Sequence, residues 1–438
     1  MVTGRPMPRF RIWLAAILVV ALVVRIGVVL ATPGYHARTD AADFDRLAVA
    51  LADHGHYPGS REWAPRGPTA FRPPLFPAAL AAVYKVVGTG SAHDRWTAGR
   101  VLEALLGALA AVLTCLIATR LWGPATGLVA GALAAIDPPL LLVGSSLLSE
   151  SLFIPLVLGA VLAALVFRTD PRLRWAALSG VLVGCAALTR GNGIVLAIPL
   201  AFLVFSRRPR RRGLHAPALL LATTILTVLP WTIRNYVEFH RFVPLTTEGG
   251  YALAGTYNAA TQHRPGFEAV WYPPLDQMRA LSAAHPRINE AQLSAHLQSE
   301  GLHYIEHHPG SVLKTAYLSA RRLLNIEGPL LEEVFAYGEG YPLRLAQYSV
   351  YAFWVVLALA LAGALTRAAR RAPSALWWCP ALILLSTVFF EGLTRYRSPA
   401  DPFFLMLAAL TLMEVARRVR RPTAAGTSAL RERVTVGR

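Results

Sequence analysis

The chain has 438 residues, of which 55% are hydrophobic and only 16% are charged, and its mean hydropathy is +0.44. No ordinary soluble domain of this length has such a composition, so the sequence predicts a polytopic membrane protein. The formal net charge of +18 does not indicate nucleic-acid binding, because the arginines gather in short loops between apolar runs, where they act as topology signals.

Long apolar segments predict an all-α protein with about ten transmembrane helices. They run approximately over residues 12–31, 99–119, 125–143, 148–167, 175–190, 193–206, 216–233, 346–366, 375–392 and 402–416. The first follows three arginines, Arg5, Arg9 and Arg11. No small-residue cleavage site comes after it, so we expect a retained anchor rather than a signal peptide.

The arginine-rich short loops all fall on one side if both termini are cytoplasmic. The two long polar segments, 32–98 and 234–345, then lie outside the membrane. We therefore expect an N-terminal transmembrane module over 1–233, which includes the first outer loop, and an extracytoplasmic segment over 234–345. C-terminal transmembrane helices over 346–417 and a cytoplasmic tail over 418–438 would follow.

Charged residues lie near the outer ends of the predicted spans. A charge at the bilayer centre costs about 2.5–3.5 kcal/mol, so such residues should face a partner or a wet cavity. The residues concerned are Asp40, Asp137, Glu150, Arg190, Arg234, Glu391, Arg395 and Arg397. Their placement predicts a charged pocket at the outer membrane face.

The first outer loop begins with a predicted amphipathic helix, since Phe44, Leu47 and Leu51 follow helical spacing behind Asp40. Asp40 is either a functional carboxylate or simply the cap of this helix, with Asp43 favourable in its first turn. A proline-rich turn and a short helix that ends near residue 87 complete the loop. A second interfacial helix is expected over 311–325.

Several motifs occur in a characteristic order. They are TDAADFDRLA from Thr39, PTAFRPPLFP from Pro68, Asp137-Pro138, Leu148-Ser149-Glu150, Leu188-Thr189-Arg190, Pro230-Trp231-Thr232-Ile233-Arg234-Asn235 and Arg395-Tyr396-Arg397. In this order the chain resembles polyprenyl-phosphate-sugar-dependent glycosyltransferases of the GT-C fold, in the bacterial branch related to protein O-mannosyltransferases and the lipid A aminoarabinose transferase. The resemblance extends over roughly residues 10–415.

This resemblance implies an enzyme that moves a sugar from a polyprenyl-phosphate donor to a glycan, lipid or protein hydroxyl by inverting displacement. It implies that Asp40, at the start of the first outer loop, is the general base. Many relatives carry two adjacent acidic residues there, whereas Ala41 follows Asp40 in this chain, so Asp43 is a rival assignment.

Such a reaction also requires cations that stabilise the phosphate leaving group, and arginine suits this role because its planar fork binds phosphate oxygens bidentately. The candidate donor-binding residues are Arg190, Arg234, Arg395 and Arg397. For each, pairing with a nearby carboxylate or lipid headgroup is an equal alternative. Glu150, Arg72 and Tyr396 are candidates for substrate contacts, and Glu150 could instead cap its helix beside Ser149.

Other chemistries find little support in the sequence. There is no Walker loop, GxGxxG, HExxH or GxSxG motif, and the three cysteines lie in apolar runs without a pairing pattern. We expect no cofactor, although His54 and His56 could hold a divalent metal with Asp40. His307-His308, before Pro309, is expected to be structural.

A secondary transporter or lipid-sugar flippase is the alternative from another class, but no half-to-half similarity is visible. The expected partners are the lipid donor, its acceptor and membrane lipids, with no nucleic acid. Arginine far outnumbers lysine, which indicates a GC-rich bacterial genome, so we expect a multi-pass protein of a bacterial inner membrane.

Overall fold

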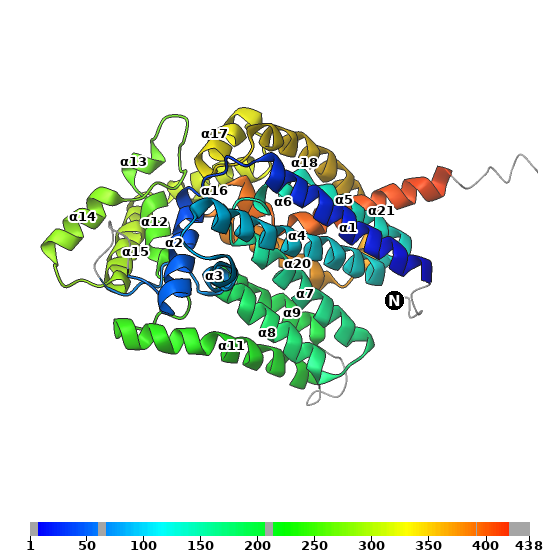
Figure 1. Cartoon of the computed structure of the whole chain (residues 1–438), viewed down its shortest axis with the longest axis horizontal. Coiled ribbons are helices and arrows are strands. Elements are labelled where there is room, and N and C mark those ends of the chain that lie inside the picture. The colour runs from blue at the N-terminus through cyan, green and yellow to red at the C-terminus, as the bar shows by residue number, and fades with distance from the viewer. Residues whose placement is uncertain (1–7, 60–66, 206–212, 391, 420–438) are drawn as a thin grey trace, which may run out of the picture.

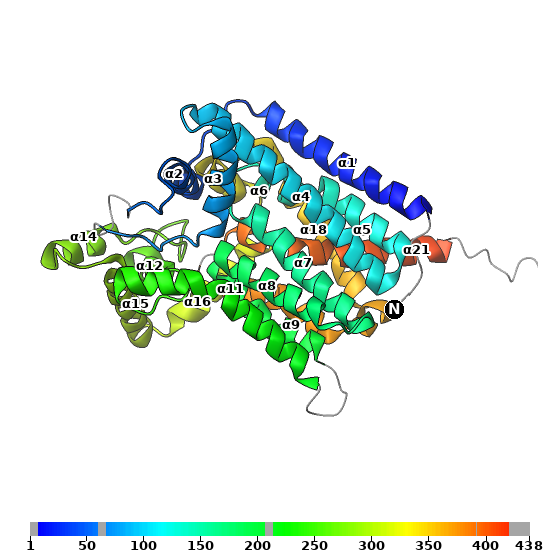
Figure 2. The same cartoon turned by 60° about the horizontal axis from the view of Figure 1, so that its bottom comes forward.

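The computed structural model describes residues 8–59, 67–205, 213–390 and 392–419. These residues form helices joined by loops, and within them no β-strand is present beyond an isolated bridge between Gly59 and Pro68. The predicted all-α class is therefore confirmed. Figures 1 and 2 show a bundle of long helices with a smaller group of short helices at one end.

The bundle consists of helices that lie on the predicted spans and of two short helices, 367–371 and 394–397, that lie between predicted spans. They are α1 (Pro8–Ala31), α4 (Ala92–Trp122), α5 (Pro124–Ile136), α6 (Pro138–Val143), α7 (Glu150–Thr169), α8 (Leu173–Thr189), η1 (Gly191–Leu196), α9 (Ala197–Val204), α11 (His215–Phe239), α18 (Leu343–Ala364), α19 (Arg367–Arg371), α20 (Ser374–Val388), η2 (Thr394–Arg397) and α21 (Asp401–Val419). Five of these, α1, α4, α7, α11 and α18, are long and apolar enough to cross a membrane.

The remaining predicted spans are shorter or interrupted. The expected span 125–143 divides at Asp137-Pro138 into α5 and α6, because proline disfavours a helical residue before it. Asp137 then caps α6 by accepting a hydrogen bond from the Leu140 N–H at 3.3 Å. The expected span 193–206 is a 3₁₀ turn followed by the short α9.

Helix packing in the bundle depends on small residues that let backbones approach closely. A Cβ at Gly180 of α8 would lie 2.2 Å from the Leu220 carbonyl oxygen of α11, and one at Gly184 would lie 2.5 Å from the Thr227 side chain. The Thr224 hydroxyl of α11 donates to the Gly180 carbonyl at 3.0 Å. In contrast, only 22–28% of the residues in the apolar windows of α1, α11 and α18 are buried, as expected of helices that face lipid.

The smaller group of helices comes from the two long polar segments. These helices are α2 (Thr39–His54), α3 (Leu75–Val87), α12 (Glu248–Thr256), α13 (Ala259–Gln262), α14 (Leu275–Ala284), α15 (Glu290–His307), α16 (Gly310–Leu323) and α17 (Pro329–Glu339). Helices are therefore present where the sequence predicts them in the first outer loop and near residues 311–325. In both views α2, α12, α14 and α15 lie at the end of the bundle opposite the start of α1 and the end of α21 (Figures 1 and 2).

This arrangement generates a topological prediction. In a cysteine-free background, Ser282→Cys in α14 should react with a membrane-impermeant maleimide in intact cells, because the 234–345 segment is expected outside. The matched variant Ser374→Cys, at the start of α20, should react only after lysis. The reverse pattern would invert the orientation.

Candidate functional site

The first turn of α2 presents Asp40 toward two arginines from distant parts of the chain. Asp40 Oδ1 forms an ion pair with Arg72 Nη2, and Asp40 Oδ2 lies 2.5 Å from Arg395 Nη2 of η2. The Asp40 side chain is 22% exposed, whereas those of Arg72 and Arg395 are 11% and 7% exposed. Both carboxylate oxygens of Asp40 are thus engaged by guanidinium groups in a partly desolvated position.

Local backbone geometry also distinguishes this position. Thr39, directly before Asp40, has a φ of 44°, a conformation that β-branched residues rarely adopt. The N-cap of α2 is Arg38, and no side-chain cap hydrogen bond is made there. The interpretation of Asp40 as a helix cap is therefore wrong, because its carboxylate is held by Arg72 and Arg395 instead.

Arg72 holds three carboxylates together. Besides Asp40, its guanidinium lies 2.7 Å from Glu248 Oε1 and 3.4 Å from Asp43 Oδ2. Its flat face packs over the ring of Phe71, with 4.8 Å to the ring centre. The proline-rich turn thereby joins α2 to α12 through one buried guanidinium.

A second ion pair lies beside the first. Arg190, which follows α8, has Nη1 2.7 Å from Glu150 Oε1 at the start of α7 and 3.0 Å from Ser149 Oγ. The ring of Tyr396 lies 5.2 Å from the Arg190 guanidinium and 4.7 Å from that of Arg395. Arg395 Nη2 also donates to the Tyr396 hydroxyl at 2.8 Å. We call Asp40, Arg72, Arg190, Arg395 and Tyr396 the Asp40 cluster.

The electrostatics of the cluster keep Asp40 ionised. Burial alone would raise the pKa of Asp40, but the charges of Arg72 and Arg395, with a further contribution from Arg190, hold it well below its usual range. Conversely, burial alone would lower the pKa of Arg72, but Asp40, Glu248 and Asp43 raise it above its usual value. In this state Asp40 is a carboxylate of low basicity.

The other predicted residues lie in different surroundings. Arg397 is buried, with its Nε 2.9 Å from Asp401 Oδ1, its Nη1 2.7 Å from Asn325 Oδ1, and the Phe353 ring under its guanidinium. Arg234 donates to the Thr69 carbonyl at 2.9 Å and packs over the Trp231 ring. Asp43 is 3% exposed and pairs with Arg46 and Arg72. Glu391 lies outside the described residues.

Two carboxylates that support the site were not predicted from the sequence. Glu248 lies 176 positions from its partner Arg72, so no local pattern connects them. Glu103, inside the α4 span, accepts hydrogen bonds from the Leu147 and Leu148 N–H groups at 2.9 and 2.7 Å and so fixes the turn that precedes Glu150. A carboxylate within an apolar span is itself a signal of such a role.

Within the described part of the chain, no group of side chains with metal-binding spacing includes a residue of the Asp40 cluster. The rings of His54 and His56 stack on each other with centroids 5.8 Å apart. The one group of three histidine, cysteine or carboxylate side chains with suitable spacing among the described residues is His303, Glu306 and His307, in α15.

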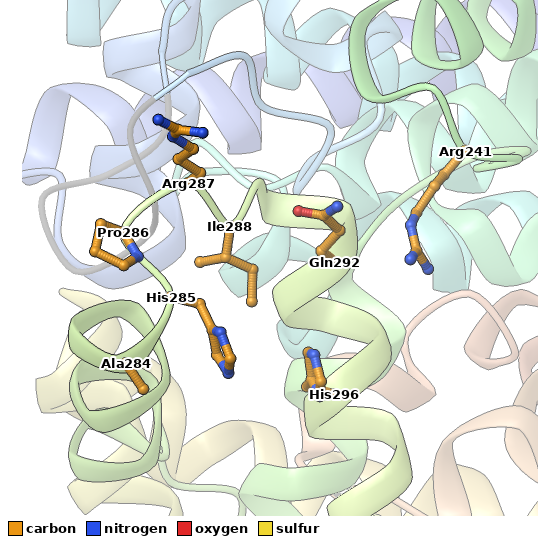
Figure 3. A pocket seen from close by; sticks show the side chains of 8 residues that line it. All are labelled: Arg241, Ala284, His285, Pro286, Arg287, Ile288, Gln292 and His296. Atoms are coloured by element: carbon orange, nitrogen blue, oxygen red, sulfur yellow. The ribbon is translucent and has the colours of Figure 1, made fainter.

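A pocket of about 500 Å³ lies near the start of α15 (Figure 3). Its lining residues are Arg241, Ala284, His285, Pro286, Arg287, Ile288, Gln292 and His296. The His285 and His296 rings are parallel, with centroids 6.0 Å apart. The pocket shares no residue with the Asp40 cluster, and its lining contains no carboxylate.

Comparisons with known proteins agree on the fold. Residues 71–233 match the family model described as dolichyl-phosphate-mannose-protein mannosyltransferase. No curated protein sequence matches the chain. Among solved structures, the oligosaccharyltransferase AglB of Archaeoglobus fulgidus in complex with an inhibitory peptide and a dolichol-phosphate covers 93% of this chain with a TM-score of 0.56 and 15% identity. A structure of the Archaeoglobus fulgidus oligosaccharyltransferase in the apo form covers 96% of this chain, with a TM-score of 0.57 and 15% identity.

This chain spans about half the length of these two oligosaccharyltransferase structures, 51% and 52% respectively. ArnT from Cupriavidus metallidurans bound to undecaprenyl phosphate is also similar, at 16% identity and a TM-score of 0.42 over 94% of this chain and 79% of its own. The predicted GT-C fold, and the resemblance to its glycosyltransferases, are confirmed.

The charge distribution of the cluster predicts how stability depends on pH. The pKa of Asp40 is depressed in the folded state. Its ion pairs therefore stabilise the fold fully at pH values above the pKa of aspartate in the unfolded chain, and this stabilisation is lost as pH falls toward the lower pKa of the folded state. The difference in unfolding midpoint between the parent and Asp40→Asn should stay constant from about pH 8 to about pH 5 and shrink below that.

Differential scanning fluorimetry of the purified proteins measures this difference. Asp276→Asn is the matched control, because the Asp276 side chain is fully exposed and its removal should leave the midpoint unchanged at every pH. A difference that already declines between pH 7 and pH 6 would contradict a depressed pKa.

Proposed function

We propose that the chain is a membrane glycosyltransferase that moves a sugar from a polyprenyl-phosphate donor to a hydroxyl acceptor. The observation that carries this proposal is the Asp40 cluster, in which one carboxylate meets the guanidinium groups of Arg72 and Arg395 beside Arg190. The family-model match and the AglB fold support it, since the first names a dolichyl-phosphate-mannose-dependent transferase and the second carries a dolichol-phosphate.

Arg395 and Arg190 are the proposed ligands of the donor phosphate. They come from different segments, and both guanidinium groups lie within 5.2 Å of the Tyr396 ring centre, so they could hold one phosphate together. Charge-assisted hydrogen bonds of this kind stabilise the leaving group as the bond between sugar and phosphate breaks. Tyr396 and Glu150 would contact the sugar or orient the arginines.

Asp40 is the proposed general base. It would take the proton of the acceptor hydroxyl as that oxygen forms a bond to the anomeric carbon and the polyprenyl phosphate leaves with the electron pair of the broken bond. Asp40 is more exposed than Asp43, whose side chain is only 2% exposed and pairs with Arg46 and Arg72. This difference in access favours Asp40 over Asp43.

The depressed pKa of Asp40 is compatible with this role if the donor changes its surroundings. A phosphate that engages Arg395 withdraws part of the positive charge from Asp40, which raises the pKa of the carboxyl and makes it a stronger base. Donor binding would thereby activate the base. Arg72, with its three carboxylate partners, would remain in place and orient Asp40.

Arg397 and Arg234 receive structural roles in this proposal. The Arg397 guanidinium is satisfied by Asp401, Asn325 and the Leu323 carbonyl, and it joins η2 to α21 and α16. Arg234 fastens α11 to the loop before Arg72 through the Thr69 carbonyl. Both would position the donor arginines and the first loop rather than bind phosphate themselves.

We further propose that the reaction takes place outside a bacterial inner membrane, with both termini cytoplasmic. The N-terminal module over 1–233 and the helices over 346–417 would supply the donor site, and the segment over 234–345 would shape the acceptor site. Glu290 of α15 connects these regions, since it accepts hydrogen bonds from the Ala70 N–H at 2.9 Å and the Thr247 hydroxyl at 2.6 Å.

The test compares Asp40→Asn with Asp43→Asn in transfer of sugar from a radiolabelled polyprenyl-phosphate pool by the purified protein. Removal of a positioned base typically lowers the rate by roughly a hundredfold or more, so Asp40→Asn should lose at least that much. Asp43→Asn, which removes one of several partners of Arg72, should lose no more than about tenfold.

Donor binding is measured alongside transfer. The Asp40→Asn variant keeps both donor arginines, so removal of the base should not weaken donor binding. Unchanged or tighter binding with lost transfer supports a base, whereas a flippase would show no transfer in the parent either. Near-parental transfer by Asp40→Asn with loss in Asp43→Asn would move the base to Asp43.

A further inference from the structure

The last two turns of α15 carry three potential metal ligands on one exposed face. His303, Glu306 and His307 follow the i, i+3, i+4 spacing that brings side chains together on a helix. Their ligand atoms all lie within 4.8 Å of one another, and all three residues are exposed. The rings of His303 and His307 have centroids only 4.1 Å apart.

The hydrogen bonding of His307 leaves its Nε2 atom available to a metal ion. Its Nδ1 lies 2.9 Å from the His303 carbonyl oxygen, and because a carbonyl oxygen can only accept, Nδ1 carries the proton. Nε2 of the neutral ring then keeps its lone pair for a metal ion. Metal-binding histidines commonly have this arrangement, in which the other ring nitrogen donates to a backbone carbonyl.

The helix that carries these residues is firmly anchored. It begins with a capping box formed by Asn289 and Gln292, and its Leu293 and Leu297 are fully buried. Gly301 permits close contact with α12, since a Cβ there would lie 2.9 Å from Leu253 Cγ. The ligands are thus presented on a fixed backbone, which lowers the entropy cost of binding.

Charge also favours a cation at this place. His307 is the last residue of α15, and the unsatisfied carbonyl groups at a helix C-terminus carry a partial negative charge that stabilises cations within the last turn. Glu306 adds a full negative charge. Two neutral imidazoles and one carboxylate make a ligand set that suits zinc and related transition metals, whereas magnesium and calcium prefer oxygen ligands alone.

We propose that His303, Glu306 and His307 bind one divalent transition-metal ion of the zinc class, at a site separate from the Asp40 cluster. Three protein ligands leave a fourth position of a tetrahedral ion open to water. The bound ion cross-links the last two turns of α15 immediately before His308-Pro309 and the start of α16. It therefore stabilises the end of this helix in the 234–345 segment.

The test is isothermal titration calorimetry with zinc chloride. The full-length protein is purified with an affinity tag that contains no histidine and is treated with a chelator before the titration. One zinc ion should bind per chain, and magnesium chloride should give no heat. His303→Ala and His307→Ala should each weaken binding by at least roughly the hundredfold that loss of even an outer-shell partner can cause. Glu306→Gln should weaken binding to a smaller extent.

His308→Ala is the matched control. His308 is also exposed, but its ring stacks on Tyr304 with centroids 4.3 Å apart, so its removal should leave zinc affinity unchanged. Zinc should raise the unfolding midpoint of the parent and of His308→Ala, but not that of His303→Ala. Equal loss of affinity in His308→Ala, or stoichiometric zinc binding by a variant that lacks all three ligands, would overturn the proposal.

Discussion

The ion pairs of Asp40 with Arg72 and Arg395 hold together segments that lie far apart in the sequence. Arg395 is 355 positions from Asp40, and Arg72 also reaches Glu248 in the second polar segment. Breaking such a partly buried pair would leave an uncompensated charge, which typically costs several kcal/mol. The first outer loop, α12 and η2 are therefore fixed relative to one another by a few guanidinium groups.

The same interaction restrains the chemistry of the site. A carboxylate held by two arginines is ionised but weakly basic, and arginines held by a carboxylate are not fully available to a phosphate. In the proposed reaction, a donor phosphate that binds Arg395 would relieve both restraints at once. Transfer without this exchange would require another base or another set of cations.

Much of this arrangement could be predicted from the sequence, since apolar runs, arginine-rich loops and helical spacing are local signals. They placed the bundle helices, α2, α3 and α16, and the motif order brought Asp40, Arg72, Arg190 and Arg395 into one hypothesis. The sequence could not separate Arg395 from Arg397, because both follow the same apolar segment. Only the fold shows that one meets Asp40 and the other Asp401. The partnership of Arg72 with Glu248 was likewise inaccessible, because it depends on tertiary contacts.

The central claim is that the donor phosphate displaces Asp40 from Arg395. The most direct measurement is a cryo-electron microscopy structure of the protein with a bound polyprenyl phosphate. We expect phosphate oxygens within hydrogen-bond distance of Arg395 and Arg190, with Asp40 still held by Arg72 but no longer by Arg395. A bound phosphate elsewhere, with the contact between Asp40 and Arg395 intact, would contradict the account.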